Sequence, residues 1–173
     1  MTLDGRLAAA GGDARWVSGE DSRRLVHELR AAADAVAVGM GTVREDEPSL
    51  TARDVGAGKQ PRRVAFGRGP LPEGSELELL SGDLEEELAH LGKEEVQSLL
   101  LEGGPTLAGA FLRADLVDKL VLFIAPKLVG GDDAPPLFAG PGARAMADAV
   151  VVTSLEVSRV GDDILVTGYV HEP

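Results

Sequence analysis

The chain contains no cysteine among its 173 residues, which excludes disulfide bonds and zinc sites with thiolate ligands. Its three histidines lie far apart in the sequence, so we expect no metal site. Aromatic residues make up only 3% of the chain, but 44% of all residues are hydrophobic, enough for a core. No apolar run approaches the length of a membrane span, and no basic and apolar leader opens the sequence. We therefore expect a cytoplasmic protein that does not bind membranes.

Positive charge is scarce and unevenly distributed. The net charge of −12 argues against nucleic acid or an anionic membrane as a partner, because both would repel the chain. Residues 1–70 contain 11 Lys and Arg against 10 Asp and Glu, whereas the rest of the chain contains 6 against 19. A phosphate ester would therefore bind to the first part of the chain. The candidate ligands are Arg15, Arg30, Arg53, Arg62 and Arg63, although each could equally be a solvated surface residue.

The most informative segment, residues 99–111, has the sequence LLLEGGPTLAGAF. An apolar strand leads through Glu102 and two glycines into a helix that begins with Pro105, a residue suited to the first helical position. A helix N-terminus leaves backbone N–H groups unpaired and favours an anion. The pattern predicts a carboxylate beside a phosphate-binding turn. A purely structural turn is the alternative, but such a turn needs one glycine and no acid.

The remaining pattern predicts alternating strands and helices. Apolar spacing indicates a helix over residues 20–33, with acidic residues in its first turn. The predicted strands are residues 35–38, 62–66, 117–125 and the segment before Glu102. A second predicted helix is capped by Asp83 and extends to residue 91. Residues 150–160 and 164–170 are predicted to form a hairpin. Residues 39–42, GMGT, are similar to a dinucleotide fingerprint, but its third glycine would fall at Arg44, so the Rossmann motif is absent.

This order of elements predicts an α/β fold with a mixed, mostly parallel sheet, helices on both faces and a C-terminal antiparallel hairpin. We expect a single domain over residues 1–173. Ligands of such sheets bind beyond the carboxyl ends of the parallel strands. Glycines follow three of the predicted strands, at Gly39 and Gly41, at Gly67, and at Gly103 and Gly104. They either converge on one cleft for an extended anion such as a pyridine dinucleotide phosphate, or simply allow strands to turn into helices.

Seven short motifs follow one another along the chain: TLDGR at residues 2–6, WVSG at 16–19, LRA at 29–31, GTV at 41–43, DEPSLT at 46–51, EGGPTL at 102–107 and APK at 125–127. In this order they resemble the reductase domain of bacterial riboflavin biosynthesis. That domain is the C-terminal half of the bifunctional pyrimidine deaminase/reductase, and its fold is similar to dihydrofolate reductase. Each motif is weak alone, but their order is highly specific and covers almost the full length.

The resemblance implies NADPH as the cofactor and assigns roles to individual residues. Positions that contact the cofactor are matched by Trp16, Thr42 and Asp46, and those that hold its phosphates by Gly104, Pro105, Thr106, Leu107, Ala108, Gly109 and Ala110. The substrate side is matched by Arg30, Leu50, Arg53 and Glu102. Guanidinium groups suit a ribose 5-phosphate, and Glu102 can accept hydrogen bonds from ribose hydroxyls or the pyrimidine. Trp16 is either a stacking wall or an ordinary core aromatic.

Asp4 and Glu102 are the candidate catalytic residues. Asp4 would polarise or protonate the substrate, although a turn residue before Gly5 is an equally good interpretation. The implied reaction is NADPH-dependent reduction of 5-amino-6-(5-phosphoribosylamino)uracil to its ribitylamino product, with hydride delivered to C1′ of the opened ribose. The protein would hold the two reacting carbons together and exclude water.

Two alternatives stay open. A pterin reductase similar to dihydrofolate reductase would need an acid in an apolar pocket but neither Arg30 nor Arg53. A nucleotide-binding protein without catalysis is the other, because in the family a strand with a lysine precedes the motif at residues 2–6. We therefore expect either a truncated start or a sheet that lacks this first strand. The apolar hairpin and the family both suggest a homodimer.

Overall fold

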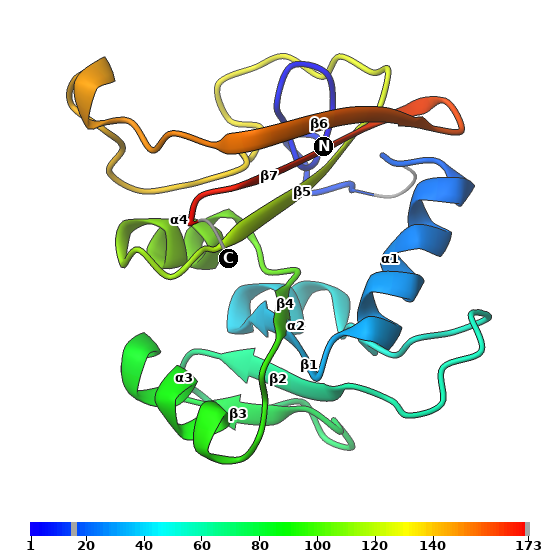
Figure 1. Ribbon diagram of the computed structural model, residues 1–173, viewed down its shortest axis with the longest axis vertical. Helices are drawn as coiled ribbons and strands as arrows, with labels where there is room; N and C mark the ends of the chain where they lie inside the picture. Colours follow the sequence, from blue (N-terminus) through cyan, green and yellow to red (C-terminus); the bar gives the residue numbers. More distant parts are fainter. Residues whose placement is uncertain (15–16, 172–173) are drawn as a thin grey trace. The chain divides into compact units, whose positions relative to one another are not determined.

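The computed structural model describes residues 1–14 and 17–171 (Figure 1). Contacts divide the chain into two compact units, one made of Met1–Arg23 with Gly109–Pro173 and the other of Arg24–Ala108. The single domain expected from the sequence therefore stays a prediction. Within the described residues, no helix is both long enough and apolar enough to cross a membrane.

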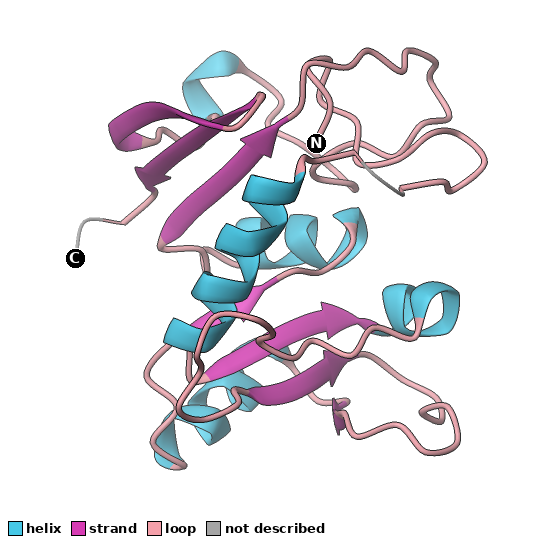
Figure 2. Ribbon diagram, turned by 90° about the vertical axis from the view of Figure 1, so that its right-hand side faces the viewer, coloured by secondary structure: helices cyan, strands magenta, loops and turns pink. Residues whose placement is uncertain are grey.

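The second unit is built on a parallel sheet, whose strands lie side by side in Figure 2. These strands are β1 (Ala35–Gly39), β2 (Arg62–Phe66), β3 (Glu78–Leu80) and β4 (Leu99–Leu101), in the order β3-β2-β1-β4. The first four residues of β1 are at most 1% exposed. Val36 and Val38 of this strand pack with Val43 and Leu50 in one core cluster. A continuous apolar run is what a parallel strand with two covered faces requires.

The described chain contains four α-helices, α1 (Glu20–Ala32), α2 (Met40–Asp46), α3 (Leu84–Lys93) and α4 (Pro105–Arg113). Glu20 and Asp21 lie in the first turn of α1, where acidic groups stabilise the helix dipole. Asp83 caps α3 by accepting a hydrogen bond from the backbone N–H of Glu85 at 3.0 Å. Pro105 is the first residue of α4. All three predicted helix starts are therefore confirmed.

The first unit contains an antiparallel sheet of β5 (Lys119–Ile124), β6 (Thr153–Val160) and β7 (Asp163–Tyr169), in the order β5-β7-β6. A short 3-10 helix, η1 (Met146–Asp148), precedes β6. The side chain of Asp163 is buried, and its Oδ2 accepts hydrogen bonds from the Gly19 N–H at 2.7 Å and from Ser22 Oγ at 2.6 Å. The hairpin of β6 and β7 therefore anchors the start of α1.

The predicted fold class is confirmed, since parallel strands alternate with helices in the second unit and an antiparallel hairpin lies at the C-terminal end. The parallel and antiparallel strands form two separate sheets. The sequence predicts no strand between residue 66 and Asp83, where β3 lies, because three residues carry no recognisable periodicity. The hairpin begins later than predicted, since residues 150–152 lie outside β6.

Candidate functional site

The glycine-bearing ends of the parallel strands lie along one edge of the sheet, as predicted. Ala37 of β1 pairs with Leu101 of β4, and the N–H of Glu102 continues this pairing by donating to the carbonyl oxygen of Ala37 at 2.8 Å. Gly39 pairs with Phe66, the last residue of β2, so that Gly67 follows directly beside it. Parallel pairing therefore brings the three strand ends to one edge, where ligands of such sheets bind.

The turn from β4 into α4 lies against the start of α2. A Cβ atom on Gly104 would be 3.2 Å from Thr42 Oγ1, and one on Gly103 would be 3.0 Å from Leu107 Cδ2. Both distances are short for a carbon, so glycine is what allows this close approach. The first turn of α4 points unpaired backbone N–H groups toward this edge, beginning with Thr106. An anion would find donors there.

The other predicted cofactor contacts differ in how far they are buried. Thr42 is half-buried in α2, whereas Asp46 is the exposed last residue of the same helix. Gly109 is buried in α4, and a Cβ atom there would overlap the carbonyl oxygen of Ala139. Packing against this backbone explains why Gly109 is a glycine. Trp16 lies outside the described residues.

Arg30 and Glu102, both predicted on the substrate side, form an ion pair with each other. Arg30 Nε donates to Glu102 Oε1 and Nη2 donates to Oε2, each at 2.6 Å, in a two-pronged arrangement that fits an ionised carboxylate. Their side chains are only 14% and 21% exposed. Arg30 Nη1 also donates to the carbonyl oxygen of Thr51 at 3.1 Å. The pair therefore links α1, the end of β4 and the loop after α2.

That loop has a strained backbone. Glu47, Leu50 and Asp54 have φ angles of 43°, 52° and 60°, in the left-handed region that residues other than glycine rarely adopt. Leu50 is also 2% exposed, and its side chain belongs to the core cluster, which gives it a packing role. Strained residues of this kind persist only where surrounding contacts hold them, and they gather at functional sites.

Two side chains hold this loop, one from α1 and one from the end of the loop itself. Gln60 exchanges two hydrogen bonds with the backbone of Ala52, both at 2.8 Å. His27 Nδ1 lies 3.1 Å from the carbonyl oxygen of Thr51 and 3.3 Å from the backbone nitrogen of Arg53. Sequence reasoning missed both side chains. The available signal was that His27 lies one turn before Arg30 on the same helix, where residues three apart share a face.

Most candidate phosphate ligands are already paired with carboxylates. Arg30 binds Glu102, while Arg62 binds Glu78 and Glu94, which raise the pKa of Arg62. Arg63 binds Glu76, and Arg15 lies outside the described residues. The exposed guanidinium group of Arg53 makes no hydrogen bond or ion pair within the described part of the chain. Arg53 is therefore the candidate whose charge is available to a ligand.

Asp4 is held as a carboxylate in a loop of the first unit. It accepts hydrogen bonds from Thr2 Oγ1 at 2.6 Å and from the N–H groups of Gly130 and Val129. The bond from Thr2, followed by those from the backbone, lowers the pKa of Asp4 to about 2. Gly5 next to it has a φ angle of 79°. These contacts are those of a turn residue, and a role of Asp4 toward the substrate stays a prediction.

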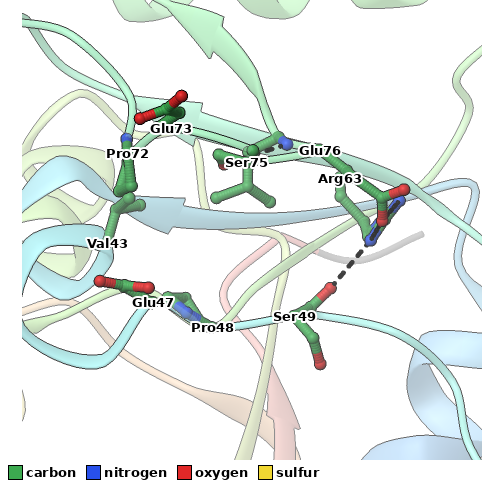
Figure 3. Close-up of a pocket in the computed structure, with 11 residues that line it drawn as sticks. Val43, Glu47, Pro48, Ser49, Arg63, Pro72, Glu73, Ser75 and Glu76 are labelled. Carbon is green, nitrogen blue, oxygen red and sulfur yellow. Dashed lines mark hydrogen bonds and ion pairs between the residues drawn. The ribbon is translucent and has the colours of Figure 1, made fainter.

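One cavity of about 240 Å³ lies at the opposite edge, near the amino ends of β2 and β3 (Figure 3). Glu47, Glu73 and Glu76 make its lining acidic. Arg63 crosses it, with hydrogen bonds to Glu76 Oε2 at 3.1 Å and to the carbonyl oxygen of Ser49 at 3.3 Å. The guanidinium therefore closes the loop after α2 against the segment before β3.

Comparison with known proteins identifies a family for nearly the whole chain. Residues 1–166 match the RibD C-terminal domain. The riboflavin biosynthesis protein RibD of Mycobacterium tuberculosis is 38% identical over 179 residues, covering 96% of this chain and 51% of that protein. A solved Thermotoga maritima structure, described as a diaminohydroxyphosphoribosylaminopyrimidine deaminase/5-amino-6-(5-phosphoribosylamino)uracil reductase, is 28% identical with a TM-score of 0.79, covering 97% of this chain and 54% of that one. The chain thus spans about half the length of these relatives.

A more distant likeness concerns the fold alone. A dihydrofolate reductase from Enterococcus faecalis, solved in complex with NADP(H) and RAB-propyl, has a TM-score of 0.63 at 12% identity, covering 98% of this chain and 91% of that one. The fold implied by the sequence motifs is therefore confirmed.

Proposed function

Because the chain belongs to the family of RibD C-terminal domains, we propose that it reduces the ribose of 5-amino-6-(5-phosphoribosylamino)uracil, with NADPH as the cofactor, in riboflavin biosynthesis. The observation that carries this proposal is the meeting of two features at one sheet edge. Glu102, which pairs with Arg30 of α1, follows β4 immediately, and the glycine turn that leads into α4 comes next. A sugar-binding carboxylate and a phosphate-binding turn are thus consecutive in the chain.

The residues present fit a dinucleotide. Gly103 and Gly104 let the turn lie close to Leu107 and Thr42, and the N-terminus of α4 favours phosphate oxygens. We assign the phosphates to the turn from Gly104 through Ala108, and a further contact to Thr42, whose hydroxyl faces Gly104. The bound cofactor would supply the hydride. The chain's own contribution is to bind the dinucleotide and fix its position relative to the sugar.

Two side chains would orient the substrate. Glu102 is held by Arg30 through one lone pair on each oxygen, so the remaining lone pairs can accept hydrogen bonds from ribose hydroxyls. Arg53 would bind the 5-phosphate, because its guanidinium is exposed and the other described candidates are paired with carboxylates. Holding the sugar at both ends limits its rotation beside the cofactor.

The decisive experiment is anaerobic NADPH oxidation with the phosphoribosylamino uracil as substrate. Two further substrates belong in the same assay, the pyrimidine that still carries its second amino group and dihydrofolate. We expect turnover of the uracil and none of dihydrofolate. Turnover of dihydrofolate alone would establish the pterin reductase instead, and NADPH binding without turnover of any substrate would establish a nucleotide-binding protein.

We also propose a homodimer, formed through the exposed face of β6. This strand is at the edge of its sheet, and Leu155 and Val157 are 61% and 63% exposed. An edge strand with exposed apolar side chains is prone to pair with another chain. A second copy of the same face would cover these side chains in both subunits.

A further inference from the structure

His27 contacts the loop that carries Arg53 through a single ring nitrogen. The side chain projects from α1, is half-buried, and lies one helical turn before Arg30. Its Nδ1 atom is 3.1 Å from the carbonyl oxygen of Thr51 and 3.3 Å from the backbone nitrogen of Arg53. One nitrogen cannot donate to the first group and accept from the second at the same time. The partners of the two backbone groups decide which bond matters.

The carbonyl oxygen of Thr51 has a second partner, whereas the N–H of Arg53 does not. Arg30 Nη1 donates to that carbonyl oxygen at 3.1 Å, so the oxygen is satisfied without His27. Within the described residues, His27 Nδ1 is the sole acceptor for the Arg53 N–H. Both of these backbone groups are therefore satisfied when Nδ1 accepts and the ring proton sits on Nε2.

The backbone around Arg53 needs such a contact. Leu50 and Asp54, on either side, both have positive φ angles. Gln60 fixes Ala52, directly before Arg53. With Ala52 held by Gln60 from the end of the same loop and Arg53 held by His27 from α1, two side chains fix the backbone from which the Arg53 side chain projects.

We propose that His27 is a positioning residue that orients Arg53 toward the phosphate of the substrate by accepting the Arg53 backbone N–H at Nδ1. This assignment rests on the proposed function. It gives His27 a role in substrate binding without contact between the imidazole and the substrate.

The test compares His27→Ala with His27→Asn, whose side-chain oxygen can take the place of Nδ1 as an acceptor. His90→Ala is the matched control, because His90 is an exposed histidine on α3. We expect His27→Ala to raise the substrate KM roughly 2- to 10-fold, the effect of one hydrogen bond, while kcat and the Kd for NADPH stay unchanged. Asn should restore most of the KM. An unchanged KM in His27→Ala, or a KM that Asn does not lower, would overturn the proposal.

A double-mutant cycle shows whether His27 acts through Arg53. In an Arg53→Ala background, His27→Ala should cause no further rise in KM, since the side chain that it orients is gone. Independent effects that multiply would contradict the proposal.

Hydrogen exchange of the Arg53 amide gives a readout that needs no turnover. His27→Ala should accelerate this exchange and Asn should slow it again, whereas equal exchange in all variants would rule out the contact. If the wild-type protein fails to reduce the uracil substrate while the amide responds as expected, the proposed function is wrong and the His27–Arg53 contact stands.

Discussion

Arg30 and Glu102 illustrate how one ion pair can serve both the fold and a ligand. The two side chains are mostly buried and joined by two hydrogen bonds of 2.6 Å. The sequence assigns both residues to the substrate side, and the structure adds their contact with each other. Residue types and order identified both members, but their pairing depends on α1 lying beside the end of β4, a long-range contact that no local pattern encodes.

Glu102→Ala should destabilise the protein as well as inactivate it. The change leaves the Arg30 guanidinium, 14% exposed, without its carboxylate, and we expect a loss of about 1–3 kcal/mol in the free energy of unfolding, measured by urea denaturation. The double variant Arg30→Met/Glu102→Leu should regain much of that stability but no activity. If the double variant recovered turnover, the pair would have no role in substrate binding.

Arg53→Ala should weaken substrate binding selectively. Loss of charge-assisted hydrogen bonds to a phosphate corresponds to about 1.5–3 kcal/mol, so we expect the substrate KM to rise roughly 10- to 100-fold while the Kd for NADPH hardly changes. Steady-state kinetics and calorimetric titration give the two constants. The exposed residue Arg144 offers the control substitution, Arg144→Ala. Equal damage to both constants would contradict the assignment of Arg53 to the substrate phosphate.

Some helices and strands could be predicted from their own sequence, and others could not. Helices α3 and α4 could be placed because Asp83 and Pro105 are local signals that act within one turn. Strand β3 could not, because its three residues are defined by pairing with β2 rather than by any pattern of their own. The division into two sheets was equally hidden, since a continuous apolar run occurs both in β4 of the parallel sheet and in β5 of the antiparallel sheet.

The turn between β4 and α4 can be tested by filling it. Gly104→Ala would place Cβ 3.2 Å from Thr42 Oγ1, and we expect the resulting strain to cost about 1 kcal/mol, which is roughly a five-fold rise in the Kd for NADPH. Gly92→Ala is the matched control, because no atom lies within 4 Å of the added carbon and the change favours the helix. A Kd for NADPH that is the same in both variants would place the cofactor away from this turn.

Because of the hydrogen bonds to Asp4, the stability of the protein should depend on pH in the acidic range. Hydrogen bonds lower the pKa of Asp4 from 3.8 to about 2, so the folded state binds this proton less readily than the unfolded state. The contribution is therefore present above pH 3.8 and is lost as the pH falls toward 2. Thermal unfolding should show Asp4→Asn to be less stable than the wild type at pH 7, with the difference closing in acid. A difference that stays constant down to pH 2 would show that the carboxylate charge is not responsible.

For the molecule as a whole, the assembly can be tested at β6. Val157→Lys should place a charge in the proposed contact between two copies and shift sedimentation from dimer to monomer. Ser158→Lys, next along the strand, points to the other face and should leave a dimer. A wild-type protein that sediments as a monomer at all concentrations would exclude the homodimer.

The uncommitted charge of Arg53 has a practical consequence for handling the protein. A tetrahedral oxyanion in the medium is a small mimic of the phosphate ester that this guanidinium would bind. Purification or kinetics in phosphate or sulfate would therefore understate the affinity for the true reactant, whereas zwitterionic buffers with chloride would report it more faithfully.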